Sequence, residues 1–133
     1  MYMLDTDICI FIIKKKTRNI LEKIKANWEK GLSISGITLA ELEFGIANAD
    51  ALYKDRNKVA LMEFLTIIKV ECFDERAAYE FGLIKKDLKD RNCLIGPYDM
   101  LIGAHAKSLA MTLVTNNENE FNRIAGLKVE NWT

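Results

Sequence analysis

Short apolar segments alternate along the chain with longer segments in which apolar residues recur every three or four positions. The short segments are typical of buried strands and the longer ones of amphipathic helices. The pattern predicts strands at 2–4, 32–35, 67–73, 112–114 and 127–132, and helices at 8–13, 18–29, 57–66, 75–90, 97–110 and 118–124, with another helix starting at Thr38. Strands that alternate with helices predict an α/β domain with a short, mostly parallel central sheet and helices on both faces.

Capping residues and spacing add detail to these helices. Thr38 is predicted to be an N-cap with Glu41 three residues later, Pro97 suits a first helical turn, and Gly31 ends a helix. The residues predicted to face the core are Ile20, Leu21, Ile24 and Trp28 in one helix, and Ala78, Phe81, Ile84 and Leu88 in another.

Composition narrows the class of protein. The 133 residues fit one domain, spanning 1–133, and 19 basic residues balance 19 acidic ones, so total charge gives no case for nucleic acid. Residues 14–30 are nevertheless basic, with seven Lys or Arg and two Glu. No signal peptide or membrane span is expected, and three cysteines without CxxC spacing favour a reducing, cytoplasmic location. No glycine-rich phosphate loop is present, which argues against a nucleoside triphosphate ligand.

Three acids end or interrupt apolar segments: Asp5, Glu41 and Asp99. A charge in such a place is costly unless it is compensated. Each has an ordinary explanation, since Asp5 suits an N-cap, Glu41 a capping box and Asp99 the favourable end of a helix dipole. However, ligands of parallel sheets collect at the carboxyl ends of the strands, where the predicted topology brings all three acids together. A shared Mg²⁺, or Mn²⁺ in its place, would neutralise them and favour phosphodiester hydrolysis.

Several polar residues are candidates for supporting this site. Thr115, Asn116 and Asn117 follow a strand and are placed to bond Asp5 or a metal water, although Asn-Asn also suits a simple turn. Lys14, Lys15, Lys16 and Arg18 are placed to contact phosphates, or they form an ordinary solvated helix face. His105, the only histidine, lies six residues after Asp99 and nearly opposite it on the predicted helix, so no metal role is expected for it.

These segments together resemble the PIN-domain ribonucleases, and more closely the VapC toxins of bacterial toxin–antitoxin pairs. The matching segments are Tyr2-Met3-Leu4-Asp5-Thr6-Asp7, Ile37-Thr38-Leu39-Ala40-Glu41-Leu42 with Gly45, Ile95-Gly96-Pro97-Tyr98-Asp99, Val114-Thr115-Asn116-Asn117 with Glu120-Phe121, and Glu130-Asn131-Trp132. One such motif alone is weak, but the ordered set spans essentially the whole chain.

The resemblance implies a PIN-like fold and a Mg²⁺-dependent endoribonuclease. It implies that Asp5 and Asp99 are the main metal ligands, and that Glu41 binds through water or helps to activate the nucleophile. The implied substrate is structured RNA, with the anticodon loop of initiator tRNA as the first candidate. The implied partners are a VapB-like antitoxin and a second toxin copy, in a larger complex that reaches promoter DNA through the antitoxin.

Two positions depart from the family pattern. Asn117 stands where many PIN domains have a fourth acid, which favours one metal over two. Asp7 stands where Asn is common, and it is expected to support Asp5 rather than bind metal. Two other functions stay open from the sequence: a haloacid-dehalogenase-like phosphatase with Asp5 as its nucleophile, and a non-catalytic PIN domain that binds RNA or a partner.

Overall fold

The computed structural model describes residues 1–14 and 18–133. Its strands are β1 (Tyr2–Leu4), β2 (Leu32–Ser35), β3 (Lys69–Glu71), β4 (Thr112–Val114) and β5 (Val129–Glu130). Its α-helices are α1 (Thr6–Ile13), α2 (Arg18–Asn27), α3 (Gly36–Ala47), α4 (Ala51–Leu65), α5 (Glu75–Asp90), α6 (Pro97–Ser108) and α7 (Glu118–Phe121), and a 3₁₀ turn, η1, covers Trp28–Lys30. No helix within the described ranges is long and apolar enough to cross a membrane.

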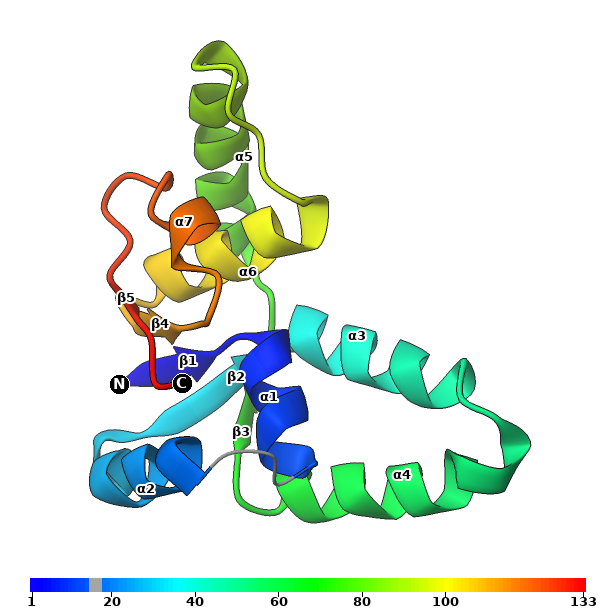
Figure 1. The fold of residues 1–133 in the computed structure, drawn as a ribbon. Coiled ribbons are helices and arrows are strands. Elements are labelled where there is room, and N and C mark those ends of the chain that lie inside the picture. Colours follow the sequence, from blue (N-terminus) through cyan, green and yellow to red (C-terminus); the bar gives the residue numbers. More distant parts are fainter. Residues whose placement is uncertain (15–17) are drawn as a thin grey trace.

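The five strands form one sheet in the order β3-β2-β1-β4-β5, and every neighbouring pair is parallel (Figure 1). The first strand of the chain is therefore the central one. Tyr2 is in register with both Leu32 of β2 and Thr112 of β4. Because the strands are parallel, their carboxyl ends, which include Leu4, Ser35 and Val114, lie at one edge of the sheet.

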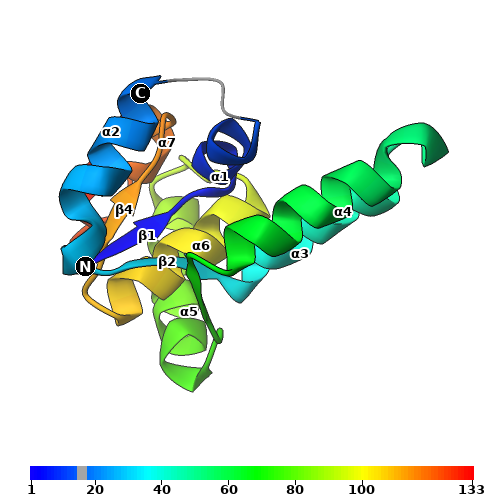
Figure 2. The ribbon, with the colours of Figure 1, turned by 90° about the horizontal axis from the view of Figure 1, so that it is seen from below.

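Two hydrophobic cores cover the two faces of the sheet. Leu4 packs with residues of α1, α2 and α4, whereas its neighbour Met3 packs with residues of α5, α6 and α7. This separation follows from the alternation of side chains along a strand. The predicted fold class, with helices on both faces of a parallel sheet, is confirmed (Figure 2).

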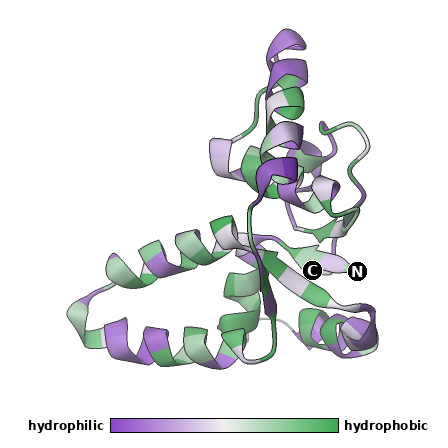
Figure 3. Cartoon of the chain, turned by 180° about the vertical axis from the view of Figure 1, so that it is seen from behind, coloured by the Kyte–Doolittle hydropathy of each residue, from purple (hydrophilic) through white to green (hydrophobic). Residues whose placement is uncertain are grey.

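Two parts of the chain extend beyond the sheet. Helices α3 and α4 lie side by side as an arm, and α5 projects in another direction (Figures 1 and 2). The far turns of α5 are mostly hydrophilic (Figure 3). The outer side of the arm is less polar, since Phe44 is 67% exposed and Leu52 81% exposed.

Some predicted details are wrong at the level of single residues. Trp28 is 47% exposed rather than buried, because α2 ends at Asn27 and Trp28 begins the 3₁₀ turn η1, where the α-helical spacing from Ile20 and Ile24 no longer holds. On α5, Ala77 is fully buried and Ala78 is exposed, one residue away from the predicted position.

Several element lengths also differ from the prediction, most of all in three places. The helix predicted at 57–66 begins earlier, at Ala51, because the arm continues past the sheet where apolar spacing no longer marks the helix. The strands predicted at 67–73 and 127–132 shorten to Lys69–Glu71 and Val129–Glu130. These are the two edge strands, each paired on one side only, so their ends leave the ladder early.

Candidate active site

Asp5 stands between the central strand and the first helix. Its backbone N–H donates to the Val114 carbonyl at 2.9 Å, which continues the β1–β4 ladder by one residue. Its side chain caps α1, because Oδ1 accepts from the Thr6 N–H at 2.6 Å. The other oxygen, Oδ2, accepts from the Thr115 hydroxyl at 2.7 Å. Asp5 is only 4% exposed, and burial raises its pKa to about 6 in spite of these two hydrogen bonds.

Glu41 approaches Asp5 from α3, and Thr6 joins the two residues. The Thr6 hydroxyl donates to Glu41 Oε1 at 2.7 Å, so its only proton is used there. Thr38 Oγ1 lies 3.2 Å from the Thr6 oxygen and is left to act as the donor in that contact. The residue after Asp5 therefore holds the side chain of Glu41 in place.

The predicted capping box at Thr38 is wrong. Helix α3 begins at Gly36, and its N-cap is Ser35, whose Oγ accepts from the Ile37 N–H at 3.0 Å. Thr38 is fully buried inside the helix, and Glu41 lies in the second turn rather than the first. With Thr38 inside the helix, the capping explanation of Glu41 no longer applies, and its carboxylate is free for other contacts.

Asp99 lies in the first turn of α6, as predicted, beside the N-cap Gly96. A helix dipole favours a negative charge there. Nevertheless, the pKa of Asp99 is raised to about 7, first by burial and then by the negative charges of Asp5, Glu120 and Glu41. Burial and the charges of the nearby acids together therefore outweigh the effect of the helix end on this carboxylate.

Glu120 is the site acid that the sequence prediction missed. Its charge and a side-chain hydrogen bond both raise the pKa of Asp99. Asn117 holds it, because Nδ2 donates to Glu120 Oε2 at 2.9 Å. Helix α7 and the turn after it pack closely on α6 at Gly103, where an added Cβ would lie 2.5 Å from Ile124 Cδ1 and 3.6 Å from Phe121 Cδ1. The available signal was the Glu120-Phe121 part of the motif, together with a spacing of three residues from Asn117, which places both on one helical face.

The remaining predicted supporting residues differ in position. Thr115 is fully buried and contacts Asp5 directly, and its Oγ1 also accepts from the Asn117 N–H at 2.9 Å. Asn117 holds Glu120 through its side-chain amide and holds the turn through its backbone N–H. Asn116 is exposed to solvent. Asp7 is also exposed, in the first turn of α1, and its charge contributes to the raised pKa of Asp5.

The predicted basic contacts are described only in part. Lys14 is exposed at the end of α1. Arg18 begins α2 with its side chain 93% exposed, 3.9 Å from Glu22. Lys15 and Lys16 lie outside the described residues. The two described cations are therefore free to meet a solvent-borne anion without the loss of a buried contact.

The four acids offer only oxygen atoms, the ligands that Mg²⁺ and Mn²⁺ prefer. Within residues 1–14 and 18–133, no three His, Cys, Asp or Glu side chains are already close enough together to hold one ion directly. Mg²⁺ usually keeps several waters and is bound directly by one or two carboxylates. Burial raises the pKa of Asp5 to about 6 and that of Asp99 to about 7, so a positive charge would stabilise these two carboxylates, and the donor set fits such an ion.

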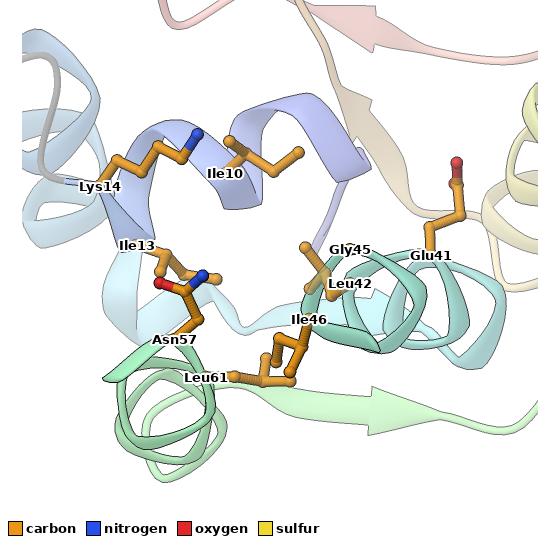
Figure 4. A pocket seen from close by; sticks show the side chains of 9 residues that line it. All are labelled: Ile10, Ile13, Lys14, Glu41, Leu42, Gly45, Ile46, Asn57 and Leu61. Carbon is orange, nitrogen blue, oxygen red and sulfur yellow. The ribbon is translucent and has the colours of Figure 1, made fainter. Parts of the chain in front are cut away.

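A pocket of about 220 Å³ opens beside Glu41, between α1, α3 and α4 (Figure 4). Its walls are mainly aliphatic, with Glu41 and Lys14 on opposite sides. The residues that line it are Ile10, Ile13, Lys14, Glu41, Leu42, Gly45, Ile46, Asn57 and Leu61. The acid cluster therefore adjoins a hydrophobic groove that is suited to the apolar side of a ligand.

Comparison with known proteins identifies the family of this arrangement. The model of the PIN domain matches residues 2–127. The chain is 39% identical to the tRNA(fMet)-specific endonuclease VapC of Salmonella typhimurium over 98% of this chain and 97% of the relative. Two solved structures superpose closely. VapBC2 from Rickettsia felis bound to a promoter DNA fragment gives a TM-score of 0.94 at 34% identity, covering 99% of this chain and 98% of that chain. DNA-bound VapBC from Salmonella typhimurium gives 0.93 at 39% identity, with the same coverage. The chain belongs to the PIN-domain family and, within it, to the VapC ribonucleases of toxin–antitoxin systems.

Proposed function

We propose that this protein is a Mg²⁺-dependent endoribonuclease toxin that cleaves initiator tRNA and is silenced by a VapB-like antitoxin. The observation that carries the proposal is the convergence of Asp5, Glu41, Asp99 and Glu120 at one edge of the sheet. Burial and mutual repulsion raise the pKa values of two of them to about 6 and about 7. Such a cluster is costly without a cation and is typical of functional sites.

The residues of the acid cluster would have separate roles in hydrolysis. Asp5 and Asp99 would hold the ion, and Glu120 lies beside Asp99 to share that role. When bound, Mg²⁺ makes water a stronger nucleophile and stabilises charge on a phosphoryl oxygen. Glu41, held by the Thr6 hydroxyl, would orient the attacking water and accept its proton. Thr115 fixes the Asp5 carboxylate.

RNA as the substrate is supported by the relatives and by the local charge. The Salmonella relative is named for its action on tRNA(fMet), and it matches this chain over nearly its whole length. The exposed cation Lys14 lines the groove that begins at Glu41, and Arg18 adds a second exposed cation at the start of α2. Contacts from such residues to phosphates would position RNA without reading its sequence.

An antitoxin partner is supported by the solved relatives and the groove. The Rickettsia and Salmonella structures are both VapBC complexes bound to DNA. The aliphatic groove beside Glu41 suits the apolar face of an inserted peptide segment. We extend to this chain a homodimer within a larger toxin–antitoxin complex that contacts promoter DNA through the antitoxin.

The direct test is metal-dependent cleavage of purified tRNAs. The wild-type protein should cut initiator tRNA in preference to elongator tRNAs, stop in EDTA, and recover with Mg²⁺ or Mn²⁺. Asp99→Asn should lose cleavage by at least about 100-fold, because it removes a ligand charge. Asp90→Asn is the matched control, since it makes the same chemical change at an exposed residue of α5. Full activity of Asp99→Asn, or activity in EDTA, would contradict the mechanism, and a phosphoaspartate trapped at Asp5 would favour a phosphatase instead.

A further inference from the structure

A buried contact joins the two helices that carry Glu41 and Asp99. The ring of His105 on α6 is 1% exposed, and its Nδ1 lies 2.7 Å from the hydroxyl of Ser35. Ser35 is fully buried and ends β2, and the same hydroxyl caps α3. One oxygen atom therefore joins the start of α3 to the last turn of α6.

The other surroundings of His105 give little reason for a histidine at this position. Phe73 meets the ring edge-on at 5.3 Å, and within the described residues Nε2 makes no hydrogen bond of good geometry, although the Cys72 backbone lies near the ring. Burial lowers the pKa of His105, against the opposite influence of Glu71, Asp74 and the Cys72 backbone. Within the part of the chain that the structure describes, the bond to the Ser35 hydroxyl is the one hydrogen bond of good geometry that the ring makes, so this contact is what histidine supplies here and an apolar side chain would not.

The contact is well placed to control the distance between the acids. Glu41 lies six residues after Ser35, and Asp99 lies six residues before His105. Six residues of α-helix span about 9 Å, so a tilt of about 5° at the contact would move either carboxylate by about 0.8 Å. A displacement of that size in an active site can cost about 100-fold in rate.

We propose that His105 and Ser35 form a positioning pair that sets the separation of Asp99 from Glu41 and thereby the geometry for the metal ion. The pair acts at a distance, through α3 and α6, and does not touch the substrate. This inference rests on the proposed metal site.

The test measures Mn²⁺ binding by electron paramagnetic resonance and single-turnover RNA cleavage on the full chain. His105→Leu should weaken Mn²⁺ binding by about 10-fold and slow saturated cleavage by about 10- to 100-fold. His105→Asn should restore both, because its amide reaches the position of Nδ1, and His105→Gln should not, because its amide reaches that of Nε2. The unfolding temperature of His105→Leu should stay within the change caused by Ser33→Ala. That control removes a buried hydroxyl from the same face of β2 that does not cap α3.

The outcomes separate this inference from the proposed function. If the wild-type protein binds no Mn²⁺, the metal site itself is wrong and the positioning role fails with it. If the wild type binds Mn²⁺ and His105→Leu matches it within twofold in binding and cleavage, the pair does not position the acids. Should His105→Leu fail to fold, the Asn and Gln variants decide, and equal Mn²⁺ binding by both would overturn the inference.

Discussion

Replacement of Asp99 by Asn should stabilise the metal-free protein at pH 8, although it removes a residue that the proposed function needs. The pKa of Asp99 rises from 3.8 to about 7 in the fold. The folded state therefore holds a proton more tightly than the unfolded chain. The contribution of Asp99 to stability is therefore greatest below about pH 4, falls as the pH rises toward 7, and stays lower above it.

The size of the effect follows from that difference. A tenfold change in proton affinity is worth about 1.4 kcal/mol, so the full penalty is about 4 kcal/mol at pH 8. Because Asp99 is only partly buried, water screens its charge, and about 2 kcal/mol should remain. In a chain of this size that corresponds to an increase of about 6 °C in the unfolding temperature of Asp99→Asn.

The assay is calorimetric unfolding of wild type and Asp99→Asn in EDTA at pH 5 and pH 8. The increase in the unfolding temperature of Asp99→Asn over wild type should be large at pH 8 and smaller at pH 5, where Asp99 is already mostly protonated. Asp74→Ala is the opposite control, since the hydrogen bonds from Ala77 and Arg76 lower the pKa of Asp74, and its loss should destabilise the protein at pH 8. An unchanged or lower unfolding temperature for Asp99→Asn at pH 8 would refute the repulsion inferred for the acid cluster.

Three further predictions concern the same site. Thr115→Val should raise the pKa of Asp5, because the hydrogen bond from the Thr115 hydroxyl lowers it. The acidic limb of the pH–rate profile should then move to higher pH, and an unmoved limb would show that Asp5 does not control it. Glu120→Gln should lower the pKa of Asp99, measured by carboxyl NMR, and weaken Mn²⁺ binding, measured by titration. If both values stay unchanged, Glu120 is not part of the site. Replacing Lys14 and Arg18 with Gln should flatten the dependence of RNA affinity on salt in filter binding, whereas an unaltered slope would leave both as solvated surface residues.

The sequence predicts the order of elements well, because strands such as Thr112–Val114 and helices such as Glu75–Asp90 carry their own apolar pattern. It is less informative where tertiary contacts decide. Ser35 caps α3 instead of Thr38, because Thr38 lies within the helix, where its hydroxyl contacts that of Thr6. Both residues are good caps, so only the packed structure distinguishes them.

The candidate site shows the same division. Asp5, Glu41 and Asp99 were predicted because each breaks an apolar segment, and the structure brings them together. Glu120 breaks no such segment, and it enters the cluster through the close packing of Gly103 and the bond from Asn117. Asn117 stands where many PIN domains have a fourth acid, and Glu120, one turn later, partly takes the place of that acid. A comparison of the motif position by position does not show this.

The central place of β1 has a consequence for biosynthesis. The strand that leaves the ribosome first must wait for β4, about 110 residues later, before both of its edges are paired. Contacts so distant in sequence close slowly. Thr115 and Glu120 arrive with that last part of the chain, so an unfinished polypeptide contains Asp5 and Glu41 without the groups that complete their site. Under the proposed function, a nascent toxin cannot cleave initiator tRNA before this last part of the chain has been made.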